Sequence, residues 1–319
     1  MTLFWVIAGL GGIAGLFWGA ETFARHLAGA SNRLGVSGFA LAILLAGAEP
    51  EELATAIAAT IRKAPGLALG DAVGANITGC LLALGVGALI APLPFRRKVL
   101  RYACLGLPLG ALASYFIWNG RLSRICGAIL VALYLLYIGT IWLLERKPPS
   151  LGEVGELEET ASLEAERGKI GKEFLLVIAG LIAMSVGATA LVDSVRHFIH
   201  AESAQTVIGT TLLGFATGFE LVVLTWSAAR HGVMEAAIAG VVGSFSYNMT
   251  MTIGAAALVR PMLLTEASEL HMPLLFMMGS LALVILLSLR KRELRRSAGI
   301  ILVGAYGLFI AFEALHANL

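Results

Sequence analysis

Residues 39–61 read FALAILLAGAEPEELATAIAATI and place Glu49, Glu51 and Glu52 in the middle of an otherwise apolar run. The run begins near residue 36 and is long enough for a helix to cross a hydrocarbon core of about 30 Å. A charge at the centre of such a helix costs about 3 kcal/mol on insertion scales, so acids there are functional candidates. The stretch therefore predicts a membrane protein whose chemistry depends on carboxylates.

The rest of the chain has the composition of an integral membrane protein. Of 319 residues, 58% are hydrophobic and 14% are charged, which lies outside the usual mix of a soluble domain. Ten apolar segments follow one another, near residues 3–20, 36–61, 66–91, 99–118, 123–144, 173–192, 206–229, 233–259, 272–289 and 297–314. We therefore expect an all-α, polytopic membrane protein of about ten transmembrane helices, embedded in a lipid bilayer.

The distribution of charge predicts orientation and excludes one class of partner. With the N-terminus outside, 17 Lys and Arg residues fall on the cytoplasmic side and 6 on the other, so both termini should face away from the cytoplasm, in a bacterial inner (plasma) membrane. No Lys or Arg precedes Trp5, so we expect the first segment to be retained rather than cleaved. The net charge of +2, without a continuous basic stripe, argues against nucleic acid as a partner.

The chain divides into two related halves. Residues 145–172 form the one long hydrophilic stretch, a Glu-rich segment that we interpret as a cytoplasmic linker between a first repeat, 1–144, and a second, 173–319. At an offset of 169 residues, Glu51 matches Glu220, and Pro92 matches Pro261. Each half holds five segments, an odd number, so consecutive copies must enter the membrane from opposite sides. The sequence predicts two inverted five-helix repeats.

The acidic segments of the two halves form the first part of a predicted cation site. Pro50 lacks an amide hydrogen and collides with the carbonyl four residues back, so we expect the helix to break and free the carbonyls of Ala46 and Gly47. Free carbonyls beside carboxylates give the all-oxygen site that hard cations require. In the second half, Thr217 and Glu220 offer oxygens, and Gly209, Gly214 and Gly218 permit similar unwinding. The alternative is that these acids lie in an interfacial or re-entrant loop.

The segment after each acidic segment supplies the second part. Residues 70–76 read GDAVGAN, and residues 240–248 read GVVGSFSYN. Asn76, Ser244, Ser246 and Asn248 offer neutral oxygens, whereas small residues at this spacing are equally typical of helix packing. The alternative for Asp71 is a position near the outer mouth.

These residues resemble the alpha repeats of the cation/calcium exchanger superfamily. Its first motif is Gly-Thr-Ser-x-Pro-Glu, and its second joins Gly-Ser to a following Asn or Asp. The first repeat resembles the family at positions that include Gly47, Glu52, Gly70, Gly74 and Gly85, and the second keeps Gly243-Ser244 with Asn248 at the polar position. The resemblance implies ten helices around a cytoplasmic loop and a midplane cation site.

The departures from that motif concern the coupling ion and the essential acid. Ala48-Glu49 stand where the family has Thr-Ser, and Glu51 stands in place of its Pro, so the case for sodium is weaker. Four acids around one dication carry more charge than the ion needs, so we expect protons to compete with sodium as the coupling ion. The family spacing favours Glu52 as the essential acid, and internal symmetry with Glu220 favours Glu51.

The leading hypothesis is a secondary active cation antiporter, not an enzyme, that exports calcium in exchange for sodium or protons. The small inorganic cations are transported, and no cofactor is implied. A non-transporting cation-binding relative is the second possibility. An intramembrane enzyme acting on a lipid-linked substrate is a third, although the spans hold no Ser/His/Asp set or metal-ligating His pair. The sequence leaves the oligomeric state undecided.

Overall fold

The computed structural model describes residues 2–33, 49–145, 170–231, 234–289 and 292–316, and the chain there is almost entirely helical. The helices of the first half are α1 (Thr2–Arg33), α3 (Pro50–Ile61), α4 (Pro65–Ile77), the π-helical turn η1 (Thr78–Ala83), α5 (Leu84–Ile90), α6 (Arg97–Trp118) and α7 (Arg124–Glu145). Those of the second half are α9 (Ile170–Phe198), α10 (Glu202–Ile208), the π-turn η2 (Gly209–Leu213), α11 (Gly214–His231), α12 (Met234–Tyr247), the π-turn η3 (Asn248–Thr252), α13 (Ile253–Val259), the 3-10 turn η4 (Ala267–Leu270), α14 (His271–Leu289) and α15 (Arg296–His316).

Eight of the helical segments in the described part are long and apolar enough to cross a membrane. The second predicted span is described only from Glu49 onward, as the short helix α3, and the eighth is the continuous stretch α12–η3–α13. Predicted and observed ends agree within a few residues for most spans. The exceptions are α1, which continues to Arg33, and α9, which continues to Phe198, so both helices carry charged ends beyond their apolar parts.

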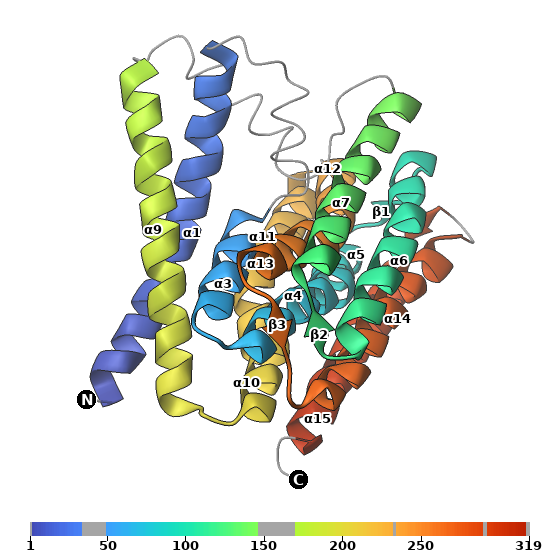
Figure 1. The fold of residues 1–319 in the computed structure, drawn as a ribbon. Coiled ribbons are helices and arrows are strands. Elements are labelled where there is room, and N and C mark those ends of the chain that lie inside the picture. The colour runs from blue at the N-terminus through green and yellow to red at the C-terminus, as the bar shows by residue number, and fades with distance from the viewer. Residues whose placement is uncertain (1, 34–48, 146–169, 232–233, 290–291, 317–319) are drawn as a thin grey trace.

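Four two-residue strands reveal the inverted symmetry of the two halves. They are β1 (Leu93–Pro94), β2 (Arg121–Leu122), β3 (Met262–Leu263) and β4 (Glu293–Leu294). β1 pairs antiparallel with β4, and β2 pairs antiparallel with β3. Each pair joins the loop after the third span of one half to the loop after the fourth span of the other. A twofold exchange of the halves therefore converts one pair into the other, and Figure 1 shows β1 and β3 toward opposite ends of the bundle.

The helices around the predicted second motif repeat the same symmetry. The π-turns η1 and η3 interrupt corresponding helices, and α5 and α13 follow them at the common offset of 169 residues. A π-turn inserts one residue into the helix and rotates the side chains that follow, a feature often found at functional sites. The chain thus consists of two inverted five-helix repeats.

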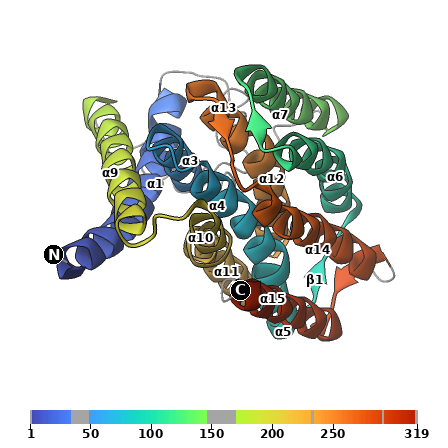
Figure 2. The same ribbon diagram turned by 60° about the horizontal axis from the view of Figure 1, so that its bottom comes forward.

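Helices α1 and α9 form a separate pair at one edge of the molecule (Figures 1 and 2). Glycines bring their backbones into contact: a Cβ at Gly12 would lie 2.7 Å from the carbonyl oxygen of Gly187, and one at Gly180 would lie 2.8 Å from that of Gly19. Gly12 corresponds to Gly180, and Gly19 corresponds to Gly187, each 168 residues later in the chain. Exchanging the two halves therefore converts one contact into the other. Such close approach is how membrane helices associate without a hydrophobic driving force.

Candidate functional site

The site begins at the first turn of α3, where the sequence sets the start of the helix. Pro50 occupies the first helical turn, where its missing N–H is no loss, and Glu49 precedes it in a non-helical conformation. The backbone N–H groups of Glu52 and Leu53 both donate to the carbonyl oxygen of Glu49. Glu51 and Glu52 lie in the first turn, where the helix dipole favours negative charge. The predicted break at Pro50 is thus a helix start.

Four carboxylates form an acidic cluster in the interior: Glu49, Glu51 and Glu52 from the start of α3, and Asp71 from α4. The side chain of Glu52 is 0% exposed and that of Asp71 is 1% exposed. Glu52 interacts electrostatically with the other three. Asp71 thus lies in the interior with the three glutamates, on a helix that is buried along almost its whole length.

Helix α11 closes the acidic cluster from the second half. Thr217 donates a 2.9 Å hydrogen bond from its hydroxyl to Oδ1 of Asp71. Thr217 and Glu51 also line one small cavity of about 10 Å³ together with Ala216, Leu16 of α1 and Leu191 of α9. A space of this size holds about one water molecule. The cavity connects the acidic cluster with the α1–α9 pair.

A network of amides and hydroxyls extends the site along α12. The amide nitrogen of Asn248 donates to Oδ1 of Asn76 and to Oγ of Ser244, each at 3.2 Å. The amide nitrogen of Asn76 donates to the carbonyl oxygen of Phe245 at 3.3 Å, and Thr252 donates to Oδ1 of Asn248. All are buried. The contacts of Asn76 with Asn248 and Phe245 join the two halves to each other in the interior.

Tyr247 is a site residue that the sequence prediction omitted. It is buried at the end of α12 and interacts electrostatically with Glu49, Glu51 and Glu52. Its ring meets that of Tyr134 of α7 edge to face, with centroids 5.3 Å apart. Tyr247 belongs to the motif GVVGSFSYN at residues 240–248. An aromatic residue in an apolar span most often serves helix packing, so the sequence did not mark Tyr247 as a site residue.

The remaining predicted residues lie apart from this cluster or outside the described residues. Glu220 is half-buried on α11, next to the exposed side chain of Phe219, and within the described part of the chain no hydrogen bond or ion pair joins it to the acidic cluster. Ala46 and Gly47 lie outside the described residues. The predicted unwinding at Gly218 is wrong, because α11 is helical there; the preceding turn η2 widens the helix instead.

In the described residues, no three His, Cys, Asp or Glu side chains converge as a preformed metal centre. The carboxylates nevertheless have unused oxygens. Both carboxylate oxygens of Glu52 are buried without a hydroxyl or amide donor, and so is Oδ2 of Asp71. Buried acceptors usually have a donor or a cation, so the cluster has the capacity to take a positively charged ligand.

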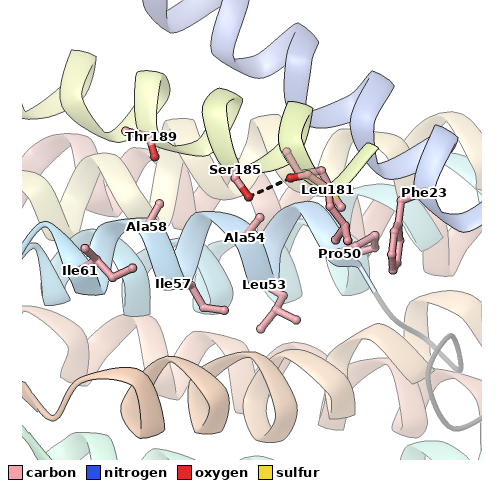
Figure 3. A pocket seen from close by; sticks show the side chains of 11 residues that line it. Phe23, Pro50, Leu53, Ala54, Ile57, Ala58, Ile61, Leu181, Ser185 and Thr189 are labelled. Atoms are coloured by element: carbon pink, nitrogen blue, oxygen red, sulfur yellow. Dashed lines mark hydrogen bonds between the residues drawn. The ribbon is translucent and has the colours of Figure 1, made fainter. Parts of the chain in front are cut away.

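The opposite face of α3 borders an apolar pocket of about 290 Å³ (Figure 3). Leu53, Ala54, Ile57 and Ala58 of α3 lie on one side of it, and Leu181, Ser185 and Thr189 of α9 lie across from them. Helix α3 is therefore packed less closely against α9 than α1 is.

Comparison with known proteins identifies the chain. The family model described as sodium/calcium exchanger protein matches residues 4–143 and 172–315, nearly all of both halves. The chain belongs to this family. Sodium/calcium exchanger family proteins are membrane transporters that exchange small cations, so the chain is a cation antiporter rather than an enzyme, and ions are its cargo rather than its cofactors.

Two curated proteins and one solved structure illustrate the relationship to other exchanger family proteins. The chain is 27% identical over 334 residues to sodium/calcium exchanger MaX1 of Methanosarcina acetivorans, covering 94% of this chain and 95% of MaX1. It is 25% identical over 280 residues to inner membrane protein YrbG of Escherichia coli, covering 85% and 84%. The sodium-calcium exchanger NCX_Mj, soaked with 10 mM Na+ and zero Ca2+, has the same fold, with a TM-score of 0.61 at 22% identity, covering 98% of this chain and 99% of that one.

Proposed function

We propose that the protein exports a divalent cation, calcium foremost, in exchange for sodium or protons that enter through the same site. The observation that carries this proposal is the acidic cluster, whose buried carboxylate oxygens lack hydroxyl or amide donors at Glu52 and at Oδ2 of Asp71. Calcium takes six to eight oxygen ligands, carboxylates and neutral oxygens together. The cluster offers carboxylates, Thr217 adds a hydroxyl in contact with Asp71, and the buried amides of Asn76 and Asn248 are further neutral oxygens in the interior.

Glu52 is the proposed essential acid of the first half, because it is the most deeply buried and interacts with all other members of the cluster. Glu51 lines the small cavity next to α1 and α9. This position suits an acid that binds the ion as it enters or leaves the site. Glu220 remains the proposed acid of the second half. It lies three residues after Thr217, so a modest rotation of α11 brings its carboxylate toward the site.

Alternating access is proposed to come from movement of the α1–α9 pair against the other helices. The glycine contacts hold α1 and α9 together as one body, whereas α3 contacts α9 beside an apolar pocket that both helices line. The small cavity beside Glu51 lies under the same pair. A shift of the pair therefore opens or closes the path to the acidic cluster without disturbing the helices that hold it.

We further propose that both termini lie outside the cytoplasm of a bacterial inner membrane, with residues 145–172 as a cytoplasmic linker between repeats 1–144 and 173–319. The start of α1 and the end of α15 lie on the same side of the molecule (Figure 1). The opposite side carries Arg96, Arg97 and Lys98 beside β1, and Arg295 and Arg296 beside β4. Clustered basic residues favour the cytoplasmic side.

The test is ion flux in proteoliposomes that contain the purified protein, with calcium, sodium and proton gradients imposed one at a time. Calcium uptake driven by an opposing sodium or proton gradient is the expected result, and the gradient that drives it identifies the coupling ion. Calcium binding without flux under any gradient would show a non-transporting relative and overturn the proposal. A variant with Glu52→Gln serves as the inactive reference.

A further inference from the structure

Asp71 lies at the contact between the two halves of the chain, and neither of the two sequence motifs gives it a role. It lies on α4 between Gly70 and Gly74, where α4 touches the second half of the chain. A Cβ at Gly70 would lie 2.8 Å from the carbonyl oxygen of Thr206, and one at Gly214 would lie 2.6 Å from backbone atoms of Gly74. The helices are thus in backbone contact, which lets the short side chain of Asp71 reach across to Thr217.

The hydrogen bond from Thr217 occupies only one of the two carboxylate oxygens of Asp71. Oδ1 accepts from Thr217, while Oδ2 is buried and has no hydrogen-bond partner in the described part of the chain. Asp71 is also within electrostatic reach of Glu49 and Glu52. An interhelical hydrogen bond needs no charge, since asparagine offers the same acceptor. A carboxylate beside two others in a membrane-spanning bundle requires a different compensation.

We propose that Asp71 is a direct ligand of the transported divalent cation and helps to determine which cation is accepted. Its free Oδ2, the carboxylate of Glu52 and the hydroxyl of Thr217 then form an all-oxygen position where α3, α4 and α11 meet. This inference rests on the proposed function. It adds a ligand from α4, so the first half of the chain contributes a carboxylate from each of two helices to one ion.

Asp71→Asn is the decisive variant because it keeps the size of the side chain and the acceptor for Thr217 but removes the charge. Glu313→Gln is the matched control. Glu313 of α15 is likewise buried and accepts a 3.2 Å hydrogen bond from Thr210, on the same long helix as Thr217. The measurement is calcium uptake in proteoliposomes over a range of calcium concentrations. We expect KM for calcium to rise at least tenfold in Asp71→Asn and to stay within about twofold in Glu313→Gln, in line with the loss of one charge-assisted contact.

A second variant keeps the test decisive if Asp71→Asn does not fold. Asp71→Glu retains the charge and extends it by one methylene, so a ligand role changes the ratio of uptake rates for manganese, calcium and strontium, which differ in size. A role in helix packing alone leaves that ratio as in the wild type. An unchanged KM in Asp71→Asn overturns the inference, and if that variant does not fold, an unchanged ratio in Asp71→Glu overturns it. Wild-type protein without any flux instead overturns the proposed function itself.

Discussion

Neutralising Glu52 should leave the protein at least as stable without cations but reduce the stabilisation that calcium provides to half or less. Glu52 is fully buried and interacts electrostatically with Glu49, Glu51 and Asp71. A charge inside a membrane-spanning bundle costs about 3 kcal/mol, and a buried amide without partners costs about 1–3 kcal/mol. Glu52→Gln should therefore gain between zero and about 2 kcal/mol in the absence of cations.

The response to calcium should change in the opposite direction. At calcium one hundred times its Kd, the wild type gains about 2.7 kcal/mol of stability from binding. Loss of one contact to a charged group, about 1.5–3 kcal/mol, weakens binding roughly 10- to 150-fold. At the same calcium concentration, Glu52→Gln should then gain only about 0.3–1.4 kcal/mol, no more than about half of the wild-type effect.

The assay is thermal unfolding of the purified protein in detergent, followed by intrinsic tryptophan fluorescence with and without calcium. Each kcal/mol corresponds to roughly 1.5 °C in Tm for a chain of 319 residues. Glu21→Gln, which neutralises an exposed acid of α1, controls for a general effect of charge. A full calcium-induced rise in Tm for Glu52→Gln, or a lower Tm than wild type without calcium, would refute the reasoning.

Three further predictions follow from the geometry. Glu220→Gln should lower calcium uptake at least tenfold if the acid of the second half takes part in transport, and normal uptake by this variant would remove Glu220 from the ligand set. Tyr247→Phe removes a hydroxyl from a side chain that interacts electrostatically with three glutamates. It should raise KM for calcium about two- to tenfold, with thermal stability measured in parallel to detect a packing defect. Gly187→Leu places a side chain where a Cβ would lie 2.6 Å from the carbonyl oxygen of Gly12, so overpacking of about 1–3 kcal/mol should lower Tm. Gly304→Leu, which meets no atom within 4 Å at its Cβ, should not.

The amino-acid sequence by itself determined the membrane class, the positions of most spans and the inverted repeat. Apolar length is a property of consecutive residues, because every backbone polar group in lipid must be satisfied within its own helix. The repeat was readable because residues such as Glu51 and Glu220, or Pro92 and Pro261, keep one offset along the chain. Glu49, Glu51 and Glu52 stood out because acids are costly in such surroundings.

Only the tertiary structure decided which side chains meet. A helical residue turns by about 100° relative to its neighbour, so the rotation of each helix, and not the order of residues, directs Asp71 and Thr217 toward each other and leaves Glu220 beside the exposed Phe219. Tyr247 comes near the start of α3 because it ends α12 directly before the turn η3, which contacts α3. These choices depend on contacts between helices far apart in the chain, and no local pattern in the sequence encodes them.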